Sequence, residues 1–197
     1  MPATTAPPAP TRARVLQAAA QVFLEHGVAA ASMDQVRLAA GVSNGSLYHH
    51  IPTKAALADA LYAHTLRDFH AVIAQPLSAR ASAQSGVKGM LRAYVAWVVA
   101  NPAGARLLHE LKRQGNLAAT DGEWSQANAQ GFALLGDWVA RKTQAGEMRA
   151  MPFPVWMALV FSPAMALTRQ WVQQDPPVVP AQVRSALEHA AWMAVAA

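Results

Sequence analysis

The 197-residue sequence has no cysteine, few acidic residues and no long uninterrupted apolar run. Without cysteine the chain cannot form disulfides, zinc fingers or a cysteine nucleophile. The longest apolar stretch, residues 151–167, contains Pro152, Pro154 and Pro163 and is shorter than the roughly 20 residues that a membrane span needs. We therefore expect a buried helix in this stretch and no membrane partner.

The first ten residues contain four prolines but neither a basic segment nor an apolar one, so they lack the features of a signal peptide. We expect a flexible tail over residues 1–10 and a cytoplasmic protein. The net charge of +5 is compatible with nucleic-acid binding. The net charge of residues 1–72 is only +1, so charge alone does not locate a DNA site.

The stretch AAGVSNGSLYHHI, residues 39–51, fits two different structures. Gly41 to Gly45 match G-x-S-x-G, the elbow that exposes a nucleophilic serine in hydrolases. The same residues fit the glycine turn and second helix of a helix-turn-helix. The preceding residues, SMDQVRLAA, have apolar side chains at helical spacing, with Ser32 as a helix cap and Gly41 as a stop. This pattern favours the helix-turn-helix, with Ser43 capping the next helix.

Helical periodicity also extends to both sides of this stretch. It predicts one helix over residues 11–26, ended by Gly27, and a fourth helix that Pro52 opens and that runs to the break at Pro76. No alternation of strands and helices is present, and a hydrolase sheet would require it. The fold class is therefore predicted to be all-α, with a small serine hydrolase using Ser43 kept as an alternative.

The segment from Arg14 to Leu57 resembles the DNA-binding domain of the TetR (tetracycline-repressor) family of bacterial transcriptional regulators. The resemblance rests on AAAQVFLEHG, SMDQV and AAGVSNGSLYHHI, followed by Lys54 and Leu57. Arg37, Leu38 and Ile51 depart from the usual pattern, in which a small residue, a polar residue and phenylalanine stand at these positions.

The resemblance implies a three-helix helix-turn-helix domain over residues 11–55. The fourth helix would join it to a larger helical domain, residues 56–197, for effector binding and dimerisation. The implied function is a sequence-specific DNA-binding regulator, a repressor in the usual mode, controlled by a small molecule, with no enzymatic activity and no cofactor. Its partners would be a double-stranded DNA operator with an inverted repeat and a second copy of the chain. A helical ligand-binding or scaffold protein without DNA binding remains the alternative.

In a helix-turn-helix, the exposed face of the second helix reaches base edges, and flanking residues bind phosphates. The expected DNA-binding residues are Ser32, Arg37, Ser43, Asn44, Gly45, Ser46, Tyr48, His49 and Lys54. Leu47 is expected to point inward. Tyr48 could instead be a half-buried core residue, and Arg12 and Arg14 could either contact DNA or lie solvated on the surface.

Amphipathic patterns after residue 87 predict further helices, one of which starts at Pro102 and ends at Gly115. By resemblance, the middle helices enclose a pocket for an apolar or aromatic effector. The candidate residues that could line it are His64, Met90, Tyr94, Trp97, Arg106, His109, Trp124, Asn128, Phe132 and Trp138. No metal site is predicted, because Arg113 stands where the sequence after His109-Glu110 would need a second histidine.

The last two predicted helices are separated by DPPVVP, and the earlier one is apolar nearly all round. Such a helix leaves a large apolar patch on a monomer, so a partner should cover it. Pro163 is expected to kink or interrupt it. The expected dimer residues are Trp156, Val160, Met165, Trp171, Leu187, Ala190 and Ala194. Ordinary intrachain core remains open for part of this set.

Overall fold

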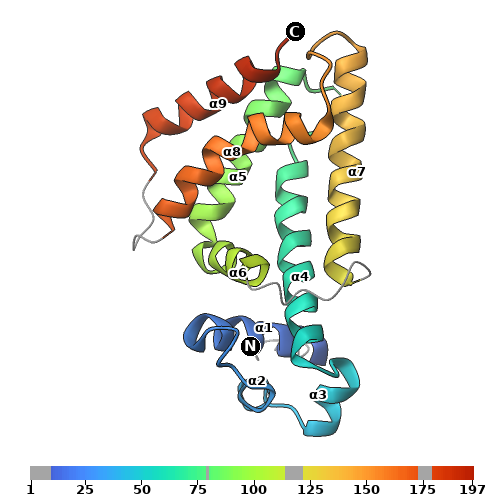
Figure 1. The fold of residues 1–197 in the computed structure, drawn as a ribbon, viewed down its shortest axis with the longest axis vertical. Helices are drawn as coiled ribbons and strands as arrows, with labels where there is room; N and C mark the ends of the chain where they lie inside the picture. The colour runs from blue at the N-terminus through green and yellow to red at the C-terminus, as the bar shows by residue number, and fades with distance from the viewer. Residues whose placement is uncertain (1–9, 79, 114–121, 173–178) are drawn as a thin grey trace, which may run out of the picture.

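The computed structural model describes residues 10–78, 80–113, 122–172 and 179–197. Within them the chain forms nine α-helices, and the only β pairing is an isolated bridge between Met148 and Ala196 (Figure 1). None of these helices is long and apolar enough to cross a membrane. The all-α class is confirmed. The helices are α1 (Thr11–His26), α2 (Met33–Ala40), α3 (Asn44–His50), α4 (Lys54–Ala74), α5 (Ala83–Ala100), α6 (Pro102–Arg113), α7 (Glu123–Gln144), α8 (Phe153–Trp171) and α9 (Ala181–Val195).

Helices α1 to α3 form a small unit at one end of the molecule, and α4 leads from it into the larger unit of α5 to α9 (Figure 1). The caps expected between α2 and α3 are confirmed. The Ser32 hydroxyl and the Gln35 side chain form a reciprocal capping box at the start of α2. Gly41 ends α2 in the left-handed conformation with φ of 61°, and the Ser43 hydroxyl caps α3. Because a helix and not a strand precedes Ser43, the elbow interpretation is wrong.

Arg14 holds this turn in place from α1. Its Nη2 donates hydrogen bonds to the carbonyl oxygens of Ala40 and Gly41, at 2.6 and 2.9 Å. These carbonyls lie at the C-terminus of α2, where a cation is favoured by the helix dipole. Arg14 therefore stabilises the helix-turn-helix from within the chain.

Helix α4 starts two residues later than the sequence predicts. Thr53 is its N-cap, with the hydroxyl accepting from the Ala56 N–H at 3.0 Å, so Pro52 lies before the helix rather than opening it. A threonine hydroxyl satisfies a free backbone N–H, which proline cannot do, and this explains the shift. The helix ends at Ala74, close to the expected break at Pro76.

Asp59 joins α4 to the start of α7. Its side chain is buried, and its two carboxylate oxygens accept hydrogen bonds from the backbone N–H groups of Glu123 and Trp124, at 2.9 and 3.2 Å. A Cβ on Gly122 would lie 2.8 Å from the Asp59 carboxylate, so the absence of a side chain at this position allows the close approach. The carboxylate thus caps α7 from another helix.

The interior contains two apolar clusters. The first combines α1 to α4 with Leu107 and Leu111 of α6 and Ala127 of α7. The second contains α5, α7, α8 and α9, and Trp138 packs in it against Gly86, where a Cβ would lie 2.3 Å from the indole. Helix α8 continues through Pro163, so the expected interruption does not occur. The expected helix end at Gly115 and nearly all of the N-terminal tail lie outside the described residues.

We predict that Gly41→Ala lowers the free energy of unfolding by about 1–2 kcal/mol, because an alanine Cβ is strained in the left-handed conformation. Its Cβ would also lie 3.2 Å from the Arg14 guanidinium. Gly45→Ala is the matched control, since it lies in α3 with open space around it and alanine favours helix by up to about 1 kcal/mol. Chemical unfolding followed by circular dichroism measures both; equal effects would contradict the assigned role of Gly41.

Asp59→Ala should lower the free energy of unfolding by about 1–3 kcal/mol, because it leaves two N–H groups of α7 without their buried acceptor. Asp34→Ala serves as the control. That carboxylate is largely exposed, and its one ion pair among the described residues is with Arg37 three residues on, an interaction worth about 0.5 kcal/mol or less. A loss no greater for Asp59→Ala than for Asp34→Ala, by the same unfolding measurement, would show that the cap contributes little.

Candidate nucleic-acid interface and ligand cavities

Helix α3 presents a polar face to solvent. Leu47 is fully buried and, together with buried Ile51, fixes the helix on the first apolar cluster. Tyr48 is 49% exposed, so the alternative that it belongs to the core is wrong. The exposed side of α3 and its cap consists of Ser43, Asn44, Gly45, Tyr48, His49 and His50, with Ser46 partly exposed. These side chains are available to a partner outside the chain.

Four of the expected DNA-binding residues have side-chain partners within the chain, and three of them lie on α2 or at a helix cap. The Ser32 and Ser43 hydroxyls accept capping hydrogen bonds, and Arg37 Nε donates to the Asp34 carboxylate at 2.8 Å. A capping hydroxyl still has a proton to donate, and a guanidinium has five donors. Their local roles therefore leave donors for phosphate oxygens, and DNA contact by these residues stays a prediction.

Lys54 has a structural contact that the sequence did not indicate. Its Nζ donates to the carbonyl oxygen of Ala29 at 2.7 Å, which ties the start of α4 to the loop after α1. An ammonium group carries three donors, so two remain for other acceptors. The position of Lys54 at the N-terminus of α4, where backbone N–H groups favour anions, fits the expected phosphate contact.

Glu123 connects the small unit to the larger one. This first residue of α7 forms an ion pair with Arg12 of α1, and its other carboxylate oxygen lies 3.7 Å from Arg67 Nη2 of α4. In this structure the partner of Arg12 is therefore Glu123 of α7, within the same chain. Sequence reasoning missed both Glu123 and Asp59; the one available signal was a carboxylate, Asp59, among the apolar residues of α4.

A mostly apolar cavity of about 460 Å³, named here the apolar cavity, lies between α4, α5, α6, α7 and α8. Five expected effector residues line it: Tyr94, Trp97, His109, Asn128 and Phe132. The Phe69 ring from α4, which was not expected, makes edge contacts with Tyr94 and Trp97 at centroid distances of 5.9 and 4.9 Å. The walls are therefore largely aromatic.

His70 also lines the apolar cavity and was missed from the sequence. Burial lowers its pKa below the ordinary histidine value, and a hydrogen bond with the Ala127 backbone opposes this effect. Its Nδ1 is buried without a hydrogen-bond partner among the described residues. A neutral imidazole here keeps the cavity free of buried charge.

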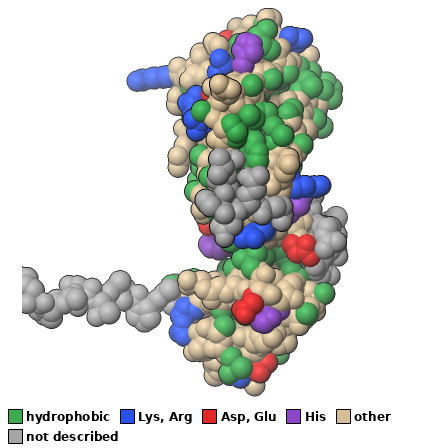
Figure 2. Space-filling view, turned by 90° about the vertical axis from the view of Figure 1, so that its left-hand side faces the viewer, with side chains coloured by type: hydrophobic (Ala, Val, Ile, Leu, Met, Phe, Trp, Pro, Cys, Tyr) green, Lys and Arg blue, Asp and Glu red, His purple; other side chains and the backbone are tan. Residues whose placement is uncertain are grey.

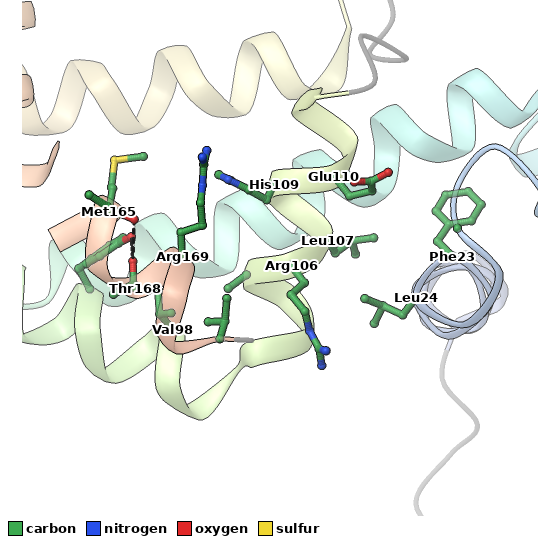
Figure 3. A pocket seen from close by; sticks show the side chains of 15 residues that line it. Phe23, Leu24, Val98, Arg106, Leu107, His109, Glu110, Met165, Thr168 and Arg169 are labelled. Carbon is green, nitrogen blue, oxygen red and sulfur yellow. Dashed lines mark hydrogen bonds between the residues drawn. The ribbon is translucent and has the colours of Figure 1, made fainter. Parts of the chain in front are cut away.

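A second cavity of about 760 Å³, named the α1-side cavity, lies between α1, α5, α6 and α8 (Figure 3). Arg106 and His109 of α6 line it, as does Arg169 near the end of α8. Figure 3 shows Arg169 rising from α8 toward His109, while Glu110 lies on the side of α1. The two cavities share Tyr94, Val98, Ala105, His109 and Met165 in their walls.

Four expected effector residues lie outside both cavity walls. His64 is exposed on α4, 3.8 Å from Asp68, while Met90 and Trp138 are buried in the second apolar cluster. Trp124 packs edge-on against Tyr62 at the start of α7. Periodicity identifies the face of a helix but not the depth along it at which a cavity lies, which explains these differences.

The apolar side chains exposed on α8 and α9 are not the same set as the expected dimer residues. Trp156, Val160, Trp171 and Leu187 are wrong for an interface, because each is buried in the second apolar cluster of its own chain. Met165 and Ala190 are exposed and Ala194 is half-buried. Three further apolar side chains are exposed on these helices: Val155 and Leu159 on α8, and Met193 on α9. Figure 2 faces the α9 side and shows hydrophobic side chains concentrated on the larger unit.

Among the described residues, no group of histidine, aspartate and glutamate side chains is arranged to hold a metal ion.

The chain is similar to known proteins in the sequence of its first helices and in its overall fold. A sequence model of the family described as "Bacterial regulatory proteins, tetR family" matches residues 15–61. This match covers α2, α3 and most of α1, and ends within α4.

Two regulators are similar in this same region. The HTH-type transcriptional regulator UidR of Escherichia coli (strain K12) is 44% identical over 52 residues, which cover 26% of each chain. The HTH-type transcriptional repressor KstR2 of Rhodococcus jostii (strain RHA1) is 32% identical over 78 residues, 38% of each chain. The chain thus matches only about a quarter to two fifths of the length of these relatives.

Solved structures extend the likeness in fold to nearly the whole chain. A putative tetR family transcription regulator from Shewanella sp. PV-4 has a TM-score of 0.80 and 22% identity, covering 95% of this chain and 99% of the other. The regulator FadR from Bacillus subtilis, solved in complex with stearoyl-CoA, has a TM-score of 0.77 and 16% identity, covering 91% and 96%. The tetR family model and these regulators match the helix-turn-helix segment of the chain, and the solved structures share the fold of nearly the whole chain.

Proposed function

We propose that the protein is a sequence-specific DNA-binding transcriptional regulator, acting as a repressor, whose affinity for its operator is set by a small-molecule effector. The exposed polar face of α3, held on the core by Leu47 and Ile51, carries this proposal. The relatives named as a transcriptional regulator and a transcriptional repressor are similar in this segment and support it. DNA binding is assigned to residues 11–55, and effector binding and dimerisation to residues 56–197.

In this proposal α3 lies in the major groove. Asn44 and Ser46 reach base edges, because an amide or a hydroxyl can both donate and accept there. Tyr48, His49 and Lys54 bind phosphates, which set position without reading sequence. Gly45 has no side chain and open space around it, so the helix can approach the duplex closely.

The apolar cavity is proposed as the effector site. Its volume of about 460 Å³ falls within the range of small-molecule pockets, and its aromatic walls favour an apolar or aromatic body. The stearoyl-CoA bound to FadR from Bacillus subtilis is a ligand with such a body. Helix α4 connects the cavity to Lys54, so a ligand that fits one tilt of α4 better than another changes DNA affinity.

The operator-binding species is proposed to be a homodimer that packs through the exposed apolar residues of α8 and α9. A two-fold dimer places two recognition helices about 34 to 36 Å apart, so the operator is an inverted repeat. A regulator of this kind acts on chromosomal DNA, which in a bacterium lies in the cytoplasm.

The central test of DNA binding is selection of bound duplexes from a random-sequence DNA pool, from which we expect an inverted repeat to emerge. Ser46→Ala should then cost about 1–3 kcal/mol on the selected site and little on unrelated DNA. Lys54→Ala should weaken binding to all sequences and reduce the salt slope by about one.

Titration by fluorescence anisotropy at several salt concentrations separates these two effects. Because Lys54 also binds the Ala29 carbonyl, its variant is compared with Arg141→Ala, an exposed cation on α7, and its unfolding midpoint is checked. Selection that yields no enriched sequence would contradict the proposed function. An unchanged salt slope for Lys54→Ala would remove Lys54 from the phosphate contacts.

Leu159→Asp should convert the dimer to a monomer at micromolar concentration, since it places a charge in the apolar face of α8. Leu38→Asp is the matched control, because Leu38 is 63% exposed on α2, remote from α8 and α9. Sedimentation velocity measures both variants. A wild-type monomer, or a dimer that survives Leu159→Asp, would place the interface elsewhere.

A further inference from the structure

We propose that His70 makes the apolar cavity sensitive to pH: uptake of a proton by its imidazole expels the ring from its seat on α7 and weakens binding of an apolar effector. The inference rests on the proposed function, because it concerns the regulation of the proposed effector site. It follows from the way in which the imidazole is packed between α4 and α7.

The seat of the imidazole on α7 exists because residue 131 is glycine. Helices α4 and α7 run side by side (Figure 1). A Cβ on Gly131 would lie 2.1 Å from His70 Nδ1 and 2.4 Å from its Cε1, so this edge of the ring lies against the α7 backbone. Phe69 of α4 and Phe132 of α7 flank the imidazole, at centroid distances of 5.8 and 6.2 Å. The ring therefore connects the two helices while it lines the cavity.

A protonated imidazole does not fit this seat. Both ring nitrogens then carry a hydrogen to donate, whereas His70 Nδ1 is buried without a hydrogen-bond partner among the described residues. Burial lowers the pKa of His70 below the ordinary value of 6.5, and the hydrogen bond with the Ala127 backbone opposes this effect without cancelling it. A buried charge and a buried N–H without an acceptor both cost free energy, so the protonated ring turns toward water.

Among the described residues, no acidic side chain lines the apolar cavity to offset a charge on His70. The other titratable or charged residues of its wall are Tyr62 and Arg67 of α4, Tyr94 of α5 and His109 of α6, while α7 and α8 contribute none. Burial raises the pKa of both tyrosines, which keeps them uncharged. Arg67 is exposed, and its Nη2 lies 3.7 Å from the Glu123 carboxylate, which offsets its charge. A proton on His70 therefore adds an uncompensated charge to the wall.

Ligand and proton consequently oppose each other at this site. An apolar ligand in the cavity removes water from the imidazole and so disfavours its charged form further. Because linkage is reciprocal, a proton on His70 weakens the ligand by the same factor by which the ligand weakens the proton. Acidification therefore releases the effector and loosens the contact of α7 with α4, the helix that begins at Lys54 in the DNA-binding unit.

The first measurement follows the ring-proton chemical shifts of the histidines in the full-length protein, with His70→Phe to assign the His70 signal. We expect the His70 midpoint to lie below 6.5. The unfolded chain then binds more protons than the native state, so the urea midpoint of unfolding falls as the pH drops from 6.5 toward the native pKa of His70. His70→Phe should remove this part of the fall, and His64→Gln, an exposed histidine of the same helix, should keep it. A His70 midpoint at or above 6.5 would overturn the inference.

The second measurement uses N-phenyl-1-naphthylamine, an apolar fluorescent probe that stays uncharged from about pH 7.5 to 5, the range in which histidine titrates. Energy transfer from Trp97, which lines the apolar cavity, reports that the probe lies there, and Trp97→Phe should lower it. Over this range we expect the affinity to fall at least about threefold in the wild type and to stay nearly constant in His70→Phe. His109→Gln tests the other histidine of the wall and should keep the full pH dependence. Loss of the dependence in His109→Gln, or its survival in His70→Phe, would contradict the role of His70.

Gly131→Ala imitates the protonated state at neutral pH. Its Cβ takes the place of the Nδ1–Cε1 edge and pushes the His70 imidazole off α7. We expect weaker probe binding than in the wild type already at neutral pH, with little further change in acid, and a His70 midpoint closer to 6.5. Gly136→Ala is the matched control, because it lies on the same helix and its added Cβ meets no atom within 4 Å. Equal effects of the two variants would show that the seat on Gly131 does not hold the ring.

Neither measurement uses DNA, which also avoids any contribution of His49 and His50 on the exposed face of α3. Failure to select a DNA sequence, combined with probe binding whose pH dependence requires His70, would reject the proposed function and leave the pH-sensitive cavity standing. An enriched inverted repeat combined with probe binding that does not depend on pH would do the reverse.

Discussion

The buried carboxylate of Asp59 is the contact on which the arrangement of the molecule depends. It accepts both free N–H groups at the start of α7 and so sets where α7 lies along α4. Because Asp59 fixes the start of α7, the Glu123 carboxylate forms an ion pair with Arg12 of α1 and approaches Arg67 of α4. Through these contacts, Asp59 fixes α7, which forms a wall of the apolar cavity, relative to α1 and α4.

The sequence was sufficient for the helix-turn-helix because local rules determine it. Capping by Ser32 and Ser43, and the left-handed conformation of Gly41, depend only on residues within a few positions, and each was found where expected. Leu47 also followed from periodicity, since a seven-residue helix with one apolar side chain has one inward direction. The start of α4 was misplaced because Thr53 and Pro52 are adjacent, and both are common at helix starts.

The larger unit was harder to predict because α8 is apolar on two sides. Trp156 and Leu159 are three positions apart on one turn, yet one is fully buried and the other 41% exposed. Hydrophobicity does not distinguish a face covered by the same chain from one left open. The partners of Arg12 and Arg14 posed the same difficulty, since Glu123 lies 111 residues from Arg12, and the carbonyls that Arg14 binds depend on how α1 packs on α2.

The first apolar cluster crosses the border between the two units. Leu107 and Leu111 of α6 and Ala127 of α7 are buried in it together with α1 to α4, although similarity to the family model ends at residue 61. The helix-turn-helix is therefore not an exchangeable module with a finished interior. A chimera that takes a DNA-reading segment from another regulator inherits a surface shaped for that regulator's α6 and α7. At these three positions of the larger unit, substitution is limited by the shape of α1 and α4.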